Sequence, residues 1–413
     1  AGFRQDGWSP VHPEAALPKV SPSDAAATPE TSEGALSGVR IVELSDPNGH
    51  SSSVAATCCM AADHGATVTK LEPKGGDPMR AQPLLFEQLN RGKQSAVVDL
   101  SDPTSLHRHL ADATVFATNL PVSKLAALNA LPAALREKYP TLIILAMTPF
   151  APVDHPDAAS QELVTADVGT FWAESGFASL MAGPDNSRPP DLPAHVGELI
   201  ASNQLFAGMC CAIFHNVRTG EGQLVHSSMV RIGTWASLIM SAMMNYDPSK
   251  LGIFWQPVEQ ASLNHPVATC NSFKTSDGAK VQLLGLPLPR HLGPLLAALE
   301  IRSSVYPRMI PTLFVDVLFN KAETKLEKMF PVFALLNSSI RDAIAQRTWA
   351  DLDALFKQHE IWYTLIRMPI QARNYDQFHA VGAFETSSSG LLVACPVKLD
   401  GCAVRGGAPP LPR

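Results

Sequence analysis

The stretch from Gly197 to Gln223, GELIASNQLFAGMCCAIFHNVRTGEGQ, predicts the helix around which the fold is organised. A single carboxylate, Glu198, precedes a long and mostly apolar run. Apolar residues recur at the spacings of three, four and seven that one helix face requires, namely Leu199, Phe206, Cys210, Ile213 and Val217. Small residues fill much of the remainder, so we expect a helix that is buried on more than one side.

Both ends of this predicted helix carry recognisable signals. Arg218 gives a cationic last turn, and Gly220 and Gly222 after it are suited to a left-handed cap. At the other end, unpaired N–H groups and the positive end of the helix dipole favour the ionised form of Glu198. Such an acid is either an anionic nucleophile or a capping residue, and the residues alone favour the cap.

Composition excludes several classes of function. The chain has 413 residues, which is enough for two or three domains. Its net charge of −6 is mild and its basic residues are scattered, so no nucleic-acid partner is expected. No apolar run is expected to span a bilayer. The seven cysteines lack CxxC or His/Cys metal spacing, which predicts buried thiols in a reducing compartment and no metal site.

The chain from Gly38 onward alternates short apolar runs with helical patterns. Strands are predicted at 39–44, 67–71, 95–100, 113–118 and 142–146, with helices that include 53–64 and 124–138. This alternation indicates a parallel sheet covered on both faces. Further on, a hairpin is expected at 272–284, helices at 290–359 and a strand near 390–397. Residues 1–35 are rich in Ala, Pro, Ser and Thr and predict an extended arm, and the start at Ala1 fits a processed precursor or a trimmed chain.

Four phrases resemble the family III CoA-transferases, a group that includes formyl-CoA and carnitine CoA-transferases and α-methylacyl-CoA racemase. They are Leu36 to Leu44, Gly65 to Pro73 with Gly76 to Arg80, Asn90 to Ser95 closing on Asp99 and Leu100, and Arg218 to Gln223. Weaker matches to the family pattern continue in the same order as far as Leu411, so the resemblance covers nearly everything after residue 35.

The resemblance implies an α/β fold with a Rossmann-like large domain around a parallel sheet and a smaller α+β domain. The expected division is an arm at 1–35, the first part of the large domain at 36–245, the small domain at 246–370, and a return to the large domain at 371–413. The resemblance also implies an interlocked homodimer.

The same resemblance implies a site. Glu198 stands where the transferases have a nucleophilic aspartate, which attacks an acyl-CoA thioester and passes through a mixed anhydride to an enzyme-bound CoA thioester. Lys74, Arg80 and Asn119 stand at or near the family's CoA contacts. Coenzyme A would then be a substrate, with no metal or resident cofactor.

Several positions that touch CoA or the acyl group depart from the family pattern. The region 46–53 lacks the Gly-Pro pair that follows the first strand, and Lys74 stands where an arginine is usual. Ala127-Leu128-Asn129 replaces a phosphate-binding arginine before Leu-Gly. Gln161-Glu162 stands where the racemase has its catalytic histidine.

Three hypotheses follow, and the departures favour the first. In the first, the chain is a non-catalytic scaffold or a subunit of a larger assembly, which its N-terminal arm contacts. In the second, it is an active CoA-transferase with Glu198 as nucleophile. In the third, it is an α-methylacyl-CoA racemase. The expected location is the mitochondrial matrix, with the cytoplasm as the alternative.

Overall fold

The computed structural model describes residues 34–46, 52–150, 153, 170–176, 178, 193, 195–236, 271–285, 288–301, 326–367, 371, 375–387, 390–397 and 399. The chain divides into two compact units. The larger unit holds Pro22–Leu180, Asp191–Leu238 and His379–Arg413, and the smaller holds Ala1–Ser21, Met181–Pro190 and Ile239–Phe378. Most of the predicted arm at 1–35 lies outside the described residues.

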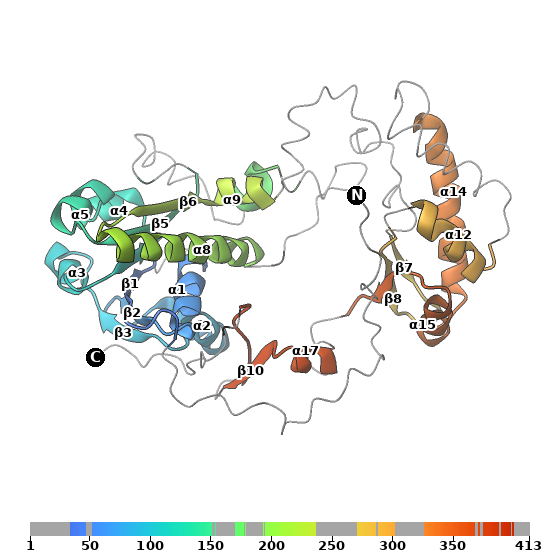
Figure 1. The fold of residues 1–413 in the computed structure, drawn as a ribbon, viewed down its shortest axis with the longest axis horizontal. Coiled ribbons are helices and arrows are strands. Elements are labelled where there is room, and N and C mark those ends of the chain that lie inside the picture. Colours follow the sequence, from blue (N-terminus) through green and yellow to red (C-terminus); the bar gives the residue numbers. More distant parts are fainter. Residues whose placement is uncertain are drawn as a thin grey trace. The chain divides into compact units, whose positions relative to one another are not determined.

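A six-stranded parallel sheet forms the centre of the larger unit (Figure 1). Its strands are β1 (Arg40–Leu44), β2 (Thr67–Glu72), β3 (Gln94–Val97), β4 (Val115–Thr118), β5 (Ile143–Thr148) and β6 (Leu224–Ser228). Their order is β3-β2-β1-β4-β5-β6, and every neighbouring pair is parallel. This is the strand order of a Rossmann sheet, in which the direction of winding reverses between β1 and β4. The predicted α/β class with a parallel sheet is confirmed.

Helices cover both faces of this sheet because apolar residues of its central strands alternate between two cores. One core joins Ile41 and Val115 to α1 (Ser53–Asp63), α8 (Val196–Thr219) and α9 (Met229–Ala236). The other joins Val42 and Phe116 to α3 (Pro103–Leu110), α4 (Val122–Ala127) and α5 (Pro132–Lys138). The larger unit also contains the 3₁₀ turn η2 (Pro78–Ala81), α2 (Pro83–Asn90) and the π-helical turn η4 (Thr170–Glu174).

The single helix predicted at 124–138 was wrong, because the structure has the two helices α4 and α5 there. Asn129 adopts a left-handed conformation with φ of 51°, which ends the first helix. Pro132 then begins the second, where its missing N–H costs nothing.

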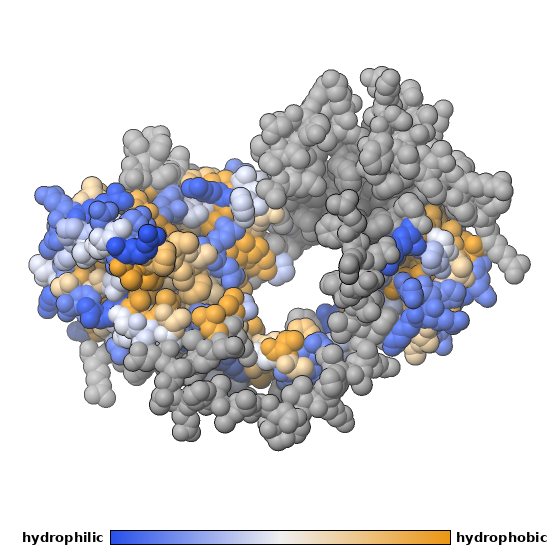
Figure 2. Space-filling view, viewed as in Figure 1, coloured by the Kyte–Doolittle hydropathy of each residue, from blue (hydrophilic) through white to orange (hydrophobic). Residues whose placement is uncertain are grey.

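The predicted buried face of α8 was wrong in part, because Ile213 is buried as expected but the two ends of that face are not. Leu199 and Val217 are 45% and 79% exposed, and the buried face instead includes Ala201, Leu205 and Met209. α8, the long yellow-green helix of Figure 1, packs on α1, whose facing residues are mostly small, so compact side chains allow the two helices to approach closely. In Figure 2 the face of the larger unit that carries α8 shows orange apolar residues among blue ones.

The expectation that no apolar run would be long enough for a bilayer was wrong for α8. Its 24 residues pass that test by length and composition, and 44% of the tested window is buried. Contacts with α1, β5, β6 and α9 give it the environment of a core helix within the larger unit.

The C-terminal segment of the larger unit forms the antiparallel hairpin β10 (Phe384–Ser387) and β11 (Gly390–Val393). Gln88 of α2 holds β11 with two hydrogen bonds, donating to the carbonyl of Val393 at 2.9 Å and accepting from its N–H at 2.7 Å. A contact between Cys395 and His64 at 3.7 Å ties the following residues to the end of α1.

The smaller unit has an antiparallel sheet of β7 (Ser272–Lys274), β8 (Lys280–Leu283) and β9 (Tyr363–Leu365). Its helices are α12 (Leu288–Ala298), α14 (Leu326–Ala345) and α15 (Trp349–Gln358), which share one apolar core with the sheet. The predicted hairpin is confirmed, with Gly278 in its turn at φ of 86°. α17 (Asp376–Ala380) lies where the chain passes from the smaller unit to the larger.

Candidate active site

The starts of α1 and α8 meet at the edge of the sheet where the parallel strands end. α1 follows the carboxyl end of β1, and α8 delivers the chain to the amino end of β6, so both helices run opposite to the strands. Ser52 Oγ lies 3.1 Å from His195 Nδ1. The Thr57 hydroxyl donates to the carbonyl of Ser53 at 2.8 Å and has the carbonyl of Ser202 as a second acceptor at 3.2 Å. The two helices are therefore parallel neighbours whose first turns lie together.

Glu198 is the third residue of α8 and is 1% exposed. The spacing of His195, Glu198 and Ser202 places them on one face of the helix, and the contacts of His195 and Ser202 show that this face meets α1. The carboxylate therefore starts from a position beside the first turns of two parallel helices. Their dipoles and N–H groups favour its ionised form.

The start of α8 is fixed against the turn at Thr170–Glu174. A Cβ added to Gly197 would lie 2.8 Å from Cγ of the Phe171 ring, so only glycine permits this approach. His195, just before the helix, has φ of 66° and makes no side-chain cap. The backbone before Glu198 is thus held in an unusual conformation for a residue with a side chain.

The point where the winding reverses, between β1 and β4, carries a polar cluster. The N–H of Asp46 donates to Asn119 Oδ1 at 2.9 Å, and Lys124 Nζ donates to the Asp46 carboxylate at 2.9 and 3.1 Å. Ligands of open α/β sheets bind outside the carboxyl ends of the strands at this point. Asn119, a predicted CoA contact, lies there and holds Asp46, the second residue beyond the end of β1.

Arg80, a second predicted CoA contact, is engaged inside the protein. Its guanidinium donates to both oxygens of Glu72, at 2.7 and 2.6 Å, and lies 4.2 Å from the centre of the Phe86 ring. Burial by itself raises the pKa of Glu72, but Arg80 and Ser95 lower it overall. The positive charge of Arg80 is therefore already balanced, which leaves it suited to holding the turn after β2.

Lys74, the third predicted contact, lies exposed in the turn that follows β2. Gly75 and Gly76 adopt φ of 103° and 93°, which shapes this turn. Among the described residues, Lys74 forms no ion pair.

A buried ion network connects β1, β2 and the turn before β3. Glu43 is fully buried, with Oε1 at 3.1 Å from Lys70 and Oε2 at 2.6 Å from Lys93. Lys70 also pairs with Asp77 at 2.9 Å. Burial by itself raises the pKa of Glu43, but Lys93 and Lys70 lower it to about 2. Glu43, Lys70 and Lys93 belong to the phrases that carried the family resemblance, so those phrases owe their pattern to the fold.

Sequence reasoning did not find the Ser52–His195 contact or the Asp46–Lys124 pair. Each joins residues far apart in the chain, and only the positions after strand ends gave a signal. The racemase position at Gln161–Glu162, the loop at 47–51 and most of 151–169 lie outside the described residues.

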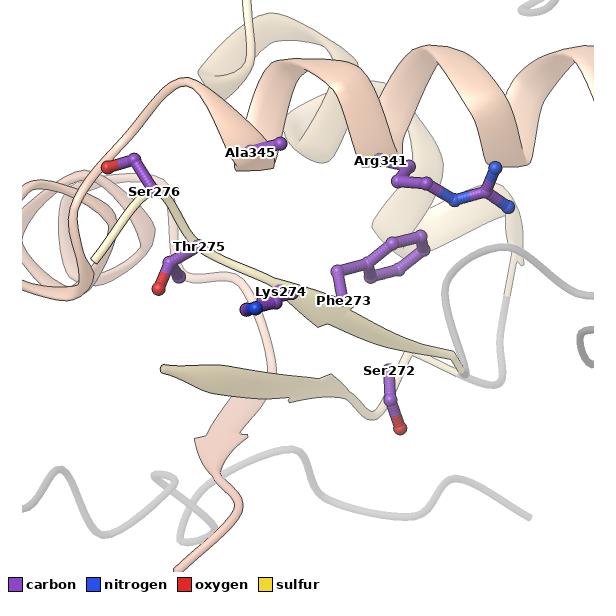
Figure 3. Close-up of a pocket in the computed structure, with 7 residues that line it drawn as sticks. All are labelled: Ser272, Phe273, Lys274, Thr275, Ser276, Arg341 and Ala345. Carbon is purple, nitrogen blue, oxygen red and sulfur yellow. The ribbon is translucent and has the colours of Figure 1, made fainter. Parts of the chain in front are cut away.

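The smaller unit has a shallow hollow of about 530 Å³ at the edge of β7 (Figure 3). Lys274, Phe273 and Arg341 are among its lining residues, and the Phe273 ring lies beside the Arg341 side chain in Figure 3. Both cations are exposed, and none of the described residues that line the hollow is an acid. Among the described residues, no group of three or more His, Cys, Asp or Glu is arranged to hold a metal ion.

Comparison with known proteins gives a consistent result. The family model of CoA-transferase family III matches residues 36–413. The sequence is 26% identical over 275 residues to (R)-2-hydroxy-4-methylpentanoate CoA-transferase of Clostridioides difficile, covering 62% of this chain and 64% of that protein. It is 29% identical over 226 residues to cinnamoyl-CoA:phenyllactate CoA-transferase of Clostridium sporogenes, covering 49% and 52%. Each match spans less than two thirds of the relative's length.

The fold has similar solved structures. The crystal structure of Rv3272 from Mycobacterium tuberculosis superposes with a TM-score of 0.70, covering 92% of this chain and 97% of that one. The two sequences are 18% identical, so this likeness concerns the fold alone.

Proposed function

This chain belongs to CoA-transferase family III, and on that premise we propose that it transfers coenzyme A between an acyl-CoA and a carboxylic acid, with Glu198 as nucleophile. The placement of Glu198 at the joined starts of α1 and α8 is the observation that supports this most. A carboxylate must be ionised to attack, and two helix dipoles favour that form.

The reaction proceeds by two exchanges at one carboxyl group. A Glu198 oxygen attacks the thioester carbonyl and the C–S bond breaks. The CoA thiolate departs, and a mixed anhydride between Glu198 and the acyl group remains. The thiolate then attacks the Glu198 carbonyl carbon, releasing the donor acid and leaving a glutamyl-CoA thioester. The acceptor carboxylate reverses these steps, so no proton or electron is gained or lost.

The bound CoA would meet Lys74 and Asn119, which lie after β2 and β4 at the carboxyl edge of the sheet. Lys74 offers a point charge for phosphate. Arg80 would act indirectly in this proposal, by holding the turn after β2 through Glu72.

A non-catalytic subunit is the second candidate, and the cations favour it. Arg80 is balanced by Glu72, and Lys124 is paired with Asp46, so two charges near the carboxyl edge are committed within the protein. In this candidate the fold is kept as a scaffold, with the N-terminal arm contacting a larger assembly.

Either candidate would act as a homodimer. Large apolar side chains are exposed on the neighbouring helices α8 and α9, including Phe214, Val217 and Trp235. Apolar surface exposed on packed helices is suited to a protein interface. Analytical ultracentrifugation should give a dimer, and Phe214→Glu should weaken it; a monomeric parent protein would contradict the proposal.

Trapping the intermediate tests the reaction directly. The purified protein is incubated with cinnamoyl-CoA or acetyl-CoA and then with hydroxylamine or borohydride, and its intact mass and peptides are measured. We expect modification at Glu198 that disappears in Glu198→Gln. Glu221→Gln, which changes an exposed acid beyond the other end of α8, is the matched control and should keep the modification. A protein that binds neither thioester at millimolar concentration by calorimetry would instead support the scaffold.

A further inference from the structure

We propose that the hydrogen bond between Ser52 and His195 holds the first turn of α8 in the position from which Glu198 attacks. His195 is then a positioning residue of the transfer reaction, and Ser52 is its anchor. This inference rests on the proposed function, since it concerns how the nucleophile is placed.

The backbone of His195 shows that its side chain has a use. Its φ of 66° lies in the left-handed region, which costs a residue with a Cβ about 1 kcal/mol and costs glycine nothing. A residue that caps a helix normally adopts an extended conformation and accepts a hydrogen bond from the first turn. His195 does neither, and its Nδ1 reaches across to Ser52 at 3.1 Å instead.

The contact at His195 is transmitted to Glu198 through one helical turn. The N–H of Leu199 donates to the carbonyl of His195 at 2.9 Å, so the backbone that encloses Glu198 is tied to His195. On the other side, Ser52 is fully buried and its carbonyl accepts from the N–H of Ala56 at 2.8 Å, which anchors it to α1. A shift of His195 relative to α1 would therefore move the carboxylate.

A second contact limits such a shift to the first turn. The Thr57 hydroxyl reaches the carbonyl of Ser202, one turn beyond Glu198. Glu198 thus lies between two attachments to α1. Breaking the Ser52–His195 bond frees the turn that carries the nucleophile, while Thr57 keeps the remainder of α8 in place.

The variants Ser52→Ala and His195→Gly test the proposal. His195→Gly removes the side chain and relieves the backbone, so it separates positioning from stability. We expect each to slow adduct formation at Glu198 by about 10- to 100-fold, because a misplacement of about 1 Å has that effect. The KM for cinnamoyl-CoA should change by no more than about twofold, since binding is untouched. The double variant should be no slower than the single ones, because both break the same bond.

Hydrogen exchange supplies a readout that does not depend on activity. Peptides covering residues 196–202 should exchange faster in both variants, whereas those covering 209–219 should not change. Thr219→Ala, which removes a side-chain hydrogen bond to the carbonyl of His215 at the far end of α8, is the control and should leave Glu198 reactivity intact. His195→Asn, which tolerates the left-handed conformation and keeps polar atoms, should recover part of the rate.

The outcomes separate the two proposals. Variants that match the parent in adduct formation at Glu198 overturn the positioning role while the transfer function stands. A parent protein that forms no Glu198 adduct overturns both.

Discussion

Two buried carboxylates of the larger unit, Glu43 and Glu198, have the same chemistry and lie in different elements of the fold. Glu43 lies on β1 with a lysine on each oxygen, Lys70 on one and Lys93 on the other. Glu198 lies at the joined starts of two helices, where partial charges of the backbone favour the anion. Side-chain cations engage the oxygens of Glu43 and make it a structural group, whereas the position of Glu198 at the helix starts is suited to a reacting anion.

Replacing each acid by its amide should separate these roles most clearly. Glu43→Gln leaves the buried Lys93 without a carboxylate and leaves Lys70 with Asp77 alone, so we expect a loss of about 3–5 kcal/mol in the free energy of unfolding. Glu198→Gln should cost about 1 kcal/mol or less, because the amide keeps the shape of the acid and gives up its favourable interaction with the helix dipoles. Urea unfolding of the purified variants measures both. An equal loss for the two variants would make Glu198 a structural acid and end the comparison.

Lowering the pH should reduce the free energy of unfolding through the protonation of Glu43. Its pKa of about 2 in the folded state lies below the value of about 4.3 for an exposed glutamate. The unfolded chain therefore binds more protons between these values, so this contribution is complete above about pH 4.3 and is lost as the pH falls towards 2. One such group changes stability by up to about 1.4 kcal/mol per pH unit. Urea unfolding at pH 5, 4 and 3 should show this slope, and Glu43→Gln should lack that component. Parallel curves would contradict the assignment.

Shortening the nucleophile tests how closely the surroundings of residue 198 fit the length of a glutamate side chain. In Glu198→Asp the carboxylate withdraws along the side chain by roughly one C–C bond, about 1.5 Å. We expect adduct formation with cinnamoyl-CoA to slow by about 100-fold, while the loss of one buried methylene lowers the free energy of unfolding by about 1 kcal/mol. Quantifying the trapped intermediate over time gives the rate. An aspartate that reacts faster than the glutamate would show that the surroundings of residue 198 favour the shorter acid.

The smallest effect is expected at the pair that is partly in solvent. The Lys124 side chain is 40% exposed beside Asp46, so Lys124→Gln should cost at most about 1 kcal/mol. Raising the salt concentration should reduce the difference between the parent and this variant, while the cost of Glu43→Gln should hardly change. A cost near that of Glu43→Gln would mean that Asp46 is held as rigidly as the buried network.

Much of the larger unit could be predicted from local patterns. Strands β1 to β5 appear as short apolar runs, and Gly220 ends α8 in a left-handed conformation as expected. Helix α2 and strand β10 had no such signal, because α2 combines apolar and polar residues in a Gly/Pro-flanked segment and β10 is short. The break between α4 and α5 was visible in Pro132, but the apolar pattern continued across it.

Only the positions of single residues in the candidate site could be predicted, not their contacts. Glu198 could be placed at a helix start from the sequence, and Asn119 and Lys74 at strand ends. The ion pair that engages Arg80 could not be seen, because Glu72 and Arg80 meet through a turn whose shape depends on glycines in left-handed conformations.

The sequence by itself determined the alternation of strands and helices, the parallel sheet and the position of one acid before an apolar helix, since these depend on residues close together in the chain. Only the tertiary structure decided which face of α8 is buried, because the small residues of α1 admit close packing there and leave Leu199 and Val217 exposed. It also decided that His195 meets Ser52 and that Glu43 lies between two lysines. Those contacts join residues far apart in sequence, and their free energy arises only when folding removes water from between them.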